Sequence, residues 1–161
     1  ISGNELIKNY QSLAKYLGKD HSIQQIFYLE SGPGYGLAKE VSLKLKEMSQ
    51  TVTEAYHFLE FRHGPISMVD ENTLVIGLMS EKVFKHEKAV LKDISQFGAK
   101  TIMIGDNNAD IVFNSGVPEN ARGVLYLPIL QLLAYYRSVS LGKNPDNPQN
   151  ITAVVELDID Y

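Results

Sequence analysis

Helical spacing of apolar residues marks four stretches of the chain. In the first, apolar residues recur every three or four positions from Leu6 to Leu17, which predicts a helix over about Asn4 to Gly18. The other predicted helices are LAKEVSLKLKEMSQ, KVFKHEKAVLKDISQFG and ILQLLAYYRSVSLG. The last two end at Gly98 and Gly142, and glycine is common just after the final helical turn.

Short apolar runs rich in β-branched and aromatic residues lie between these stretches. They predict five strands: IQQIFYLESG, TVTEAY, NTLVIGLMS, AKTIMIGD and GVLYLPI. Unbroken apolar runs such as NTLVIGLMS suit a parallel sheet that is covered on both faces. Strands alternating with helices therefore predict one α/β domain of three layers, built with right-handed crossovers. No linker divides the chain into two domains.

Composition narrows the class of protein. The chain has 161 residues, of which 44% are hydrophobic and 21% charged, as in a globular protein. Its net charge of −4 gives no reason to expect nucleic acid or an anionic membrane as a partner, and no apolar run is long enough to span a membrane. The absence of cysteine excludes disulfides and thiolate metal sites and fits a cytoplasmic protein. Because the chain begins at Ile1 without a methionine, we expect a segment of a longer polypeptide.

A strip of charged residues borders the buried face of the second predicted helix. At about 100° per residue, Glu40, Lys44 and Glu47 share an arc about 60° wide. The apolar stripe beside it consists of Leu37, Val41, Leu45 and Met48. In one interpretation, Glu40 and Lys44 form an ion pair that contributes about 0.2–0.5 kcal/mol, with Glu47 merely nearby. In the other, Glu47 is a partly desolvated general base, and Lys44 holds its carboxylate or a substrate oxygen.

A second candidate is the histidine of the segment EFRHGP. Gly64 and Pro65 must break any helix that contains the preceding residues, so backbone geometry fixes the position of His63. An imidazole suits proton transfer near neutral pH, although a solvent-facing or capping histidine has the same pattern. The remaining histidines, His21, His57 and His86, are interpreted as structural or exposed. No histidine or carboxylate spacing predicts a metal site, and no cofactor is expected.

The glycine-rich segment SGPGYG follows a predicted strand and opens a helix. This is the position of phosphate-cradling loops, but the segment matches neither a P-loop nor GxGxxG, and a tight turn explains its glycines better. Ligands of open α/β sheets bind at the carboxyl ends of the strands, so Ser31 is a candidate substrate contact. The strongly apolar helix that contains Tyr135 and Tyr136 predicts core or a subunit interface.

Three segments in register, GLAKEVSLKLKEMS, EAYHFLEFRHGP and LQLLAYYRSVSLGKNPDNPQN, resemble the SIS (sugar isomerase) domain family. The resemblance covers about residues 25–156 and is closest to the second of two SIS domains in glucosamine-6-phosphate synthase-like isomerases and deaminases. It implies a flavodoxin-like domain with a five-stranded parallel sheet, over residues 1–161 with a C-terminal tail at 143–161. It also implies a second SIS domain in the same polypeptide and a homodimer.

The resemblance also implies residue roles. The glutamate that closes the K-L-K-E run, Glu47, moves protons between the first two sugar carbons. The histidine of H-G-P, His63, helps to open the sugar ring and is contributed to the neighbouring subunit's site. Lys44 and Glu40 match charged positions that line the site. The substrate is a sugar phosphate, whose phosphate is held by the other SIS domain.

The tail departs from the synthase branch of that family. A pattern like P-R-N-L-A-K, with a lysine able to form a Schiff base, is replaced here by PQNITA, so that Gln149 and Ala153 stand in place of the arginine and the lysine. We therefore expect an enzyme that deaminates or isomerises an amino-sugar phosphate such as glucosamine 6-phosphate. The alternatives are the isomerase half of a glutamine-dependent synthase, or a non-catalytic module that binds sugar phosphates.

Overall fold

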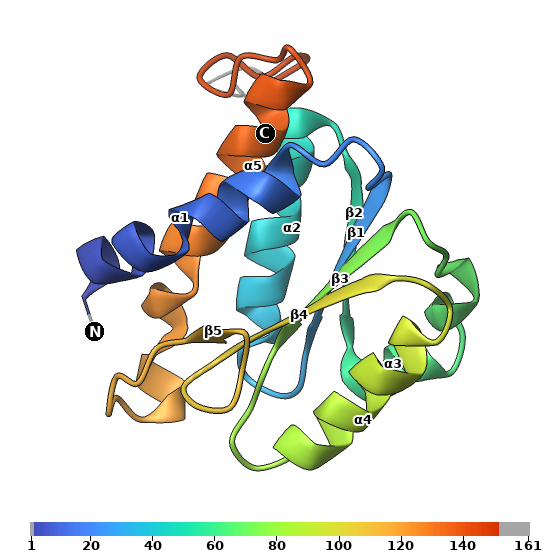
Figure 1. Cartoon of the computed structure of the whole chain (residues 1–161), viewed down its shortest axis with the longest axis vertical. Helices are drawn as coiled ribbons and strands as arrows, with labels where there is room; N and C mark the ends of the chain where they lie inside the picture. Colours follow the sequence, from blue (N-terminus) through green and yellow to red (C-terminus); the bar gives the residue numbers. More distant parts are fainter. Residues whose placement is uncertain (1, 152–161) are drawn as a thin grey trace, which may run out of the picture.

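A computed structural model describes residues 2–151 and shows a parallel sheet between two layers of helices (Figure 1). The strands are β1 (Gln25–Glu30), β2 (Val52–His57), β3 (Thr73–Leu78), β4 (Lys100–Gly105) and β5 (Ile111–Val112). Their order is β2-β1-β3-β4-β5, and every neighbouring pair is parallel. This is the flavodoxin-like order, so the predicted fold class is confirmed.

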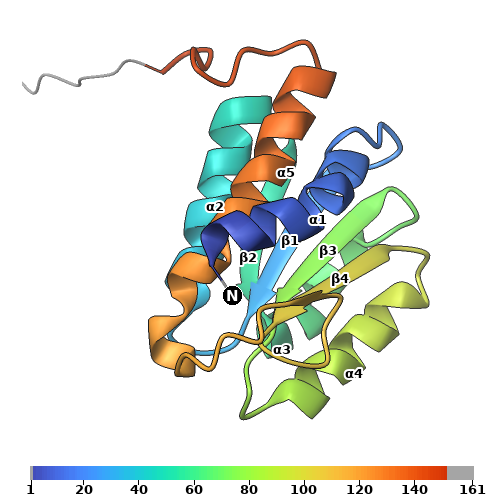
Figure 2. The same ribbon diagram turned by 60° about the vertical axis from the view of Figure 1, so that its left-hand side comes forward.

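The helices divide between the two faces of the sheet (Figure 2). One face carries α1 (Gly3–Gly18), α2 (Tyr35–Ser49) and α5 (Leu127–Ser140), and the other carries α3 (Phe58–Arg62) and α4 (Phe84–Ser95). Short 3-10 turns complete the described chain at Pro65–Met68, Glu119–Ala121 and Gly123–Leu125. The four helices predicted from apolar spacing are all present.

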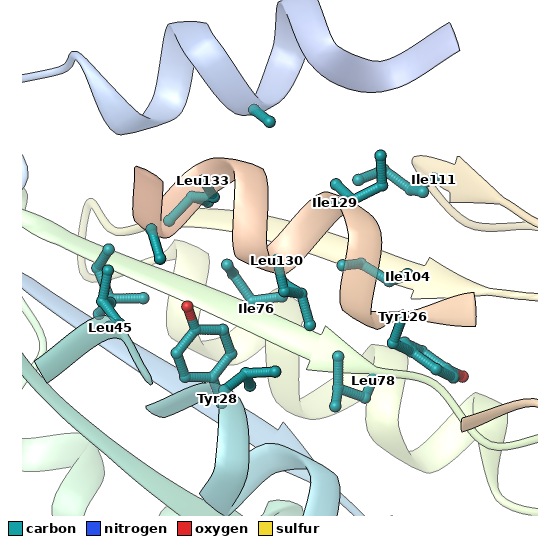
Figure 3. Close-up of a cluster of buried hydrophobic side chains, with 14 of the residues drawn as sticks. Tyr28, Leu45, Ile76, Leu78, Ile104, Ile111, Tyr126, Ile129, Leu130 and Leu133 are labelled. Atoms are coloured by element: carbon teal, nitrogen blue, oxygen red, sulfur yellow. The ribbon is translucent and has the colours of Figure 1, made fainter. Parts of the chain in front are cut away.

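Successive side chains of the central strands point to opposite faces of the sheet, and this produces two separate hydrophobic cores. In β1, Ile26 and Tyr28 point into the core under α1, α2 and α5, whereas Phe27 and Leu29 point into the core under α3 and α4. Figure 3 shows the first core, where side chains of α5 such as Leu130 lie over the central strands. Because both faces of β1 are apolar and buried, the strand reads as an unbroken hydrophobic run.

Helices α1 and α5 cross at a glycine. A Cβ atom added to Gly18 would lie 2.8 Å from the Cβ of Tyr136 and 2.9 Å from the carbonyl oxygen of Leu133. Only hydrogen fits at this distance, so Gly18 allows the two backbones to approach closely. This contact fixes the C-terminal end of α1 against α5.

The predicted fifth strand is wrong in its location. GVLYLPI forms a 3-10 turn and the start of α5, with Pro128 in the first helical turn, where a missing N–H costs nothing. The fifth strand is instead the two-residue Ile111–Val112, which is too short for its pattern to stand out. Tyr126 in the mispredicted segment is buried as a strand residue would be, with its ring edge-on to Phe113 at 4.7 Å.

A buried arginine ties α5 to the amino end of the sheet. The guanidinium of Arg137, 5% exposed, donates to the carbonyl oxygen of Asp20 (2.7 Å), to that of Ile23 and to Oγ1 of Thr51 (3.2 Å). These acceptors lie just before β1 and β2. One side chain thus bonds to acceptors in two connections, and the carbonyl oxygens of Asp20 and Ile23 both receive a guanidinium hydrogen bond.

We expect the Arg137→Met substitution to lower the free energy of unfolding by about 2–3 kcal/mol, because it removes three hydrogen bonds from a buried charged donor, including the one to the carbonyl oxygen of Ile23. The matched control is Arg62→Met, which removes a half-exposed arginine paired with Asp93 at 2.7 Å. That change should cost no more than about 1 kcal/mol. Urea unfolding of the two variants measures the difference, and equal losses would contradict the role assigned to Arg137.

Candidate active site

The charged strip predicted from the sequence lies on the outer side of α2. The helix buries Ala38, Val41 and Leu45 against the sheet, and this leaves the strip at the border of the buried face. Within the strip Glu40 is exposed, whereas Lys44 and Glu47 are half-buried. The structure thus brings these three residues together along one edge of the helix.

Lys44 pairs with Glu47 and not with Glu40. Its Nζ lies 2.8 Å from Oε2 of Glu47, and the two side chains are 43% and 26% exposed. This hydrogen bond, and then the negative charges of Glu47 and Glu40, raise the pKa of Lys44. The ion pair contributes about 0.5 kcal/mol or less to stability, so its main effect is to orient the carboxylate.

The last turn of α2, which carries Glu47, is held in place by side chains. Ser138 on α5 donates its hydroxyl to the carbonyl oxygen of Met48 (2.7 Å), and Ser49 donates to that of Leu45 (2.7 Å). Gln50 then ends the helix in the left-handed region, with φ of 55°. The carbonyl of Met48 is one of the last four of the helix and has no partner within it, so the bond from Ser138 fixes the backbone beside Glu47.

The start of the tail packs against the same helix end. The side-chain amide of Gln50 accepts a hydrogen bond from Nζ of Lys143 and donates one to Oε1 of Gln149 (3.1 Å). Gln149 is the residue that replaces the arginine of the resembling pattern. It is thus bonded to Gln50, which follows Glu47 by three residues in the sequence. Ala153, in place of the lysine, lies outside the described residues.

His63 lies on the other side of the sheet. It follows α3, its backbone N–H donates to the carbonyl oxygen of Glu60 (3.0 Å), and its side chain is exposed. Because α2 and α3 cover opposite faces of the sheet, one chain does not bring His63 to Glu47 (Figure 1). The helix break at Gly64 and Pro65 is present as predicted.

Ser31 lies at the opposite end of α2 from Glu47. It follows β1 directly, whereas Glu47 is in the final turn of the helix; the twelve residues from Tyr35 to Glu47 span about 18 Å. Its hydroxyl lowers the pKa of Glu87 on α4, against the larger effect of burial, which raises that pKa. The structure therefore does not group Ser31 with the charged strip.

Two carboxyl groups near Ser31 did not emerge from the sequence patterns. Glu30 at the end of β1 is 7% exposed and Glu87 in the first turn of α4 is 1% exposed. Burial, and next the charge of Glu87, raise the pKa of Glu30 to about 7, and burial raises the pKa of Glu87 as well. One signal was available: Glu87 falls on the helical stripe of Val90, Leu91 and Ile94, where a charge is unexpected.

Two hollows lie near the candidate residues, one beside α2 and one at the carboxyl ends of the strands. A groove of about 350 Å³ runs along the outer side of α2. Its lining residues are Gly36, Lys39, Glu40, Ser42, Leu43, Lys46 and Glu54. A second hollow of about 530 Å³ lies at the carboxyl ends of β3 and β4, between Ser80 and Asp106. Glu40 therefore borders a groove, and the carboxyl edge of the sheet offers a separate space.

Two classes of feature are missing from residues 2–151. No group of three or more His, Cys, Asp or Glu side chains in this part of the chain is arranged to hold a metal ion. Nor does any helix there have the length and hydropathy that a membrane span requires.

Curated relatives are similar in sequence to this chain over most of its length. An isomerizing glutamine–fructose-6-phosphate aminotransferase of Clostridium tetani is 34% identical over 155 residues, which are 91% of this chain and 26% of that protein. The enzyme of the same description from Sulfolobus acidocaldarius is 31% identical, over 95% of this chain and 27% of that protein. The chain thus spans about a quarter of the length of these relatives.

Solved structures share the fold. A glucosamine-6-phosphate deaminase of Thermotoga maritima superposes with a TM-score of 0.79 and 27% identity, over 95% of this chain and 49% of that one. A tagatose-6-phosphate ketose/aldose isomerase of Escherichia coli gives 0.79 with 23% identity, over 92% and 44%, and shows the fold alone. Residues 21–128, more than half of the chain, match the family described as SIS domain. The chain belongs to the SIS domain family.

Proposed function

We propose that this chain is the catalytic half of a phosphosugar isomerase or deaminase that acts on an amino-sugar phosphate such as glucosamine 6-phosphate. The observation that carries the proposal is the half-buried carboxylate of Glu47, oriented by Lys44 on a helix end that α5 holds rigid. Similarity to a deaminase at 27% identity and to aminotransferases at up to 34% supports a phosphorylated sugar as the substrate.

The proposed chemistry moves one proton between two carbons. Glu47 removes the proton from C2 of the open-chain amino sugar and returns it to C1, while the aldehyde oxygen O1 takes up a proton that the amino nitrogen releases. The product carries a hydroxyl group on C1 and an imine at C2. Water then hydrolyses the imine to fructose 6-phosphate and ammonia. Lys44, at 2.8 Å from Glu47, keeps the carboxylate directed and can also contact a substrate oxygen, while Glu40 lines the neighbouring groove.

His63 is proposed to open the sugar ring in the site of a neighbouring subunit. Its exposure on the face opposite to α2 supports a role between chains, since it cannot reach Glu47 of its own chain. The proposal therefore includes a homodimer and a second SIS domain that supplies the phosphate contacts. A segment of about half the length of its structural neighbours is consistent with such a partner domain.

A second candidate is the isomerase half of a glutamine-dependent synthase. The names of the aminotransferase relatives favour it, whereas Gln149 and Ala153 in the tail favour the deaminase or isomerase. Ammonia release from glucosamine 6-phosphate, compared with interconversion of aldose and ketose phosphates and with glutamine-dependent amination, separates the three. Tight binding of a sugar phosphate without any of these activities would favour a non-catalytic module.

The Glu47→Gln substitution in the intact polypeptide should lower kcat by about 10²- to 10⁴-fold, because it removes the proposed proton carrier. The control is Glu71→Gln, which neutralises an exposed carboxylate outside the groove. The Glu71→Gln variant should leave kcat unchanged, and both variants should keep the wild-type melting temperature. Steady-state kinetics and thermal unfolding measure these outcomes, and wild-type kcat in Glu47→Gln would refute the assignment.

Mixing two inactive variants tests whether sites are shared between subunits. If Glu47 and His63 come from different protomers, random dimers of Glu47→Gln and His63→Asn should recover about one quarter of wild-type activity, since half of the dimers contain one intact site. The unmixed variants serve as controls. Activity that stays at the level of the single variants after subunit exchange would show that His63 does not act across the dimer.

A further inference from the structure

The sheet has two edges, and a tyrosine closes one of them. At β5, the hydroxyl of Tyr10 on α1 accepts a hydrogen bond from the backbone N–H of Val112 (3.0 Å) and donates one to the carbonyl oxygen of the same residue (3.3 Å). One side chain thus bonds to both backbone groups of an edge residue, as a neighbouring strand would. Backbone groups left unpaired at an edge can otherwise bind another strand. Val112 is therefore not available for such pairing.

The opposite edge, at β2, is open. In the described part of the chain β1 is the only strand that pairs with β2, so the other side of β2 has no strand beside it. Thr53 lies 3.4 Å from a serine hydroxyl of α2, and Ala55 belongs to the core beneath that helix. These two side chains thus point toward α2. Because side chains alternate along a strand, Val52, Glu54 and Tyr56 point to the other face.

Apolar surface is exposed on the side of this edge that faces away from α2. Val52 at the start of β2 is 60% exposed, and so is Leu59 in α3, the helix that follows β2. Tyr56 between them is only half-buried. A strand added beside β2 with apolar side chains on this side would remove that surface from water, which is favourable.

On the other side of the edge lies the groove of about 350 Å³ along α2. Its lining residues include Lys39 and Lys46, which are seven positions apart and so share one side of the helix. Lys46 reaches the edge and pairs with Glu54 (2.9 Å), whereas Lys39 has no carboxylate within salt-bridge distance among residues 2–151. Glu40 also lines the groove, about 100° around the helix from Lys39. Lys39 is thus a cation that can pair with an added acidic side chain.

The chain itself returns to the start of this edge. Oε1 of Gln149 accepts a hydrogen bond from the side-chain amide of Gln50 (3.1 Å), and Gln50 stands two residues before β2. Nζ of Lys143 bonds to the same amide. Chain that continues from Gln149 in the direction of β2 would be parallel to it, as every neighbouring pair of strands in this sheet is.

The sequence that continues beyond the described residues has the pattern of an edge strand. It reads TAVVELDIDY over residues 152–161, and apolar and acidic residues alternate from Val155 to its end. Gln149 and Gln50 are 99 positions apart. With the same offset Val155 falls beside Tyr56, on the side with exposed apolar surface. The acidic residues then fall on the side of α2, and a slip of one residue would reverse both assignments.

We propose that residues 152–161 bind along β2 of their own chain as a sixth parallel strand. Backbone hydrogen bonds to the open edge hold the segment, Val155 and Leu157 cover the apolar surface, and Glu156 and Asp158 lie toward Lys39. The sheet then has no open edge at either end. This placement involves neither a substrate nor the chemistry proposed for the charged strip, so it stands or falls independently of the proposed function.

An introduced disulfide tests the placement, because this chain has no cysteine of its own. In the intact polypeptide, Glu54→Cys combined with Ala153→Cys places two thiols directly across adjacent strands, about 5 Å apart, within the range that a disulfide spans. Mild oxidation should link most of the protein within single chains, as peptide mass mapping measures. The matched control is Glu54→Cys with Val154→Cys, whose side chain points to the other face. It should link about tenfold more slowly.

Three outcomes of this experiment would overturn the proposal: no link, equal linking of both pairs, or a link between two chains, which would assign the segment to a second copy. Hydrogen exchange gives a second measurement with native residues in place. Without residues 152–161, outward-facing amides of residues 52–57 should exchange about tenfold faster, while amides of β3 keep their rates and show that the fold persists. Unchanged exchange in β2 would refute the proposal.

Discussion

The structure depends on the burial of β1 and β3 on both of their faces. Each of these strands places apolar side chains alternately into two cores, so neither face can be left to water. Helices must therefore cover both sides, and the chain must leave the end of each strand toward one side or the other. That requirement places α2 and α4 on opposite faces of the sheet.

The proposal that the site is shared between chains rests on the same layering. Glu47 belongs to the layer of α1, α2 and α5, and His63 follows a helix of the opposite layer. A parallel sheet separates the two residues in any one chain, so chemistry that needs both must use more than one chain. The rigid end of α2, bonded to Ser138 of α5, is suited to present a carboxylate to such a shared space.

Much of the fold could be predicted because the spacing of apolar residues and the length of an apolar run can be read from a short stretch of sequence. The run NTLVIGLMS could only be a buried strand, and the spacing from Leu6 to Leu17 could only be a helix of the observed length. The fifth strand was misplaced because GVLYLPI has the composition of a strand, and only its packing against Phe113 and the start of α5 decides otherwise. Tertiary contacts decided that case, and they are not visible in a short window of sequence.

The candidate site shows the same division. Helical geometry placed Glu40, Lys44 and Glu47 together, but the choice of Lys44's partner depended on rotamers and neighbouring side chains. The burial of Glu30 and Glu87, 57 positions apart in the sequence, depends on the packing of the whole sheet, which no spacing rule describes.

The left-handed turn at Gln50 has a further consequence, for the choice of residue at this position. A glycine would adopt its φ of 55° without the cost of about 1 kcal/mol that a side chain incurs there. Glycine would also abolish both hydrogen bonds of the amide to Lys143 and Gln149. The backbone conformation thus favours glycine at position 50, whereas attachment of the tail requires glutamine. A variant selected only for thermal stability could acquire glycine there, and it would lose the hydrogen bonds that hold the start of the tail to α2.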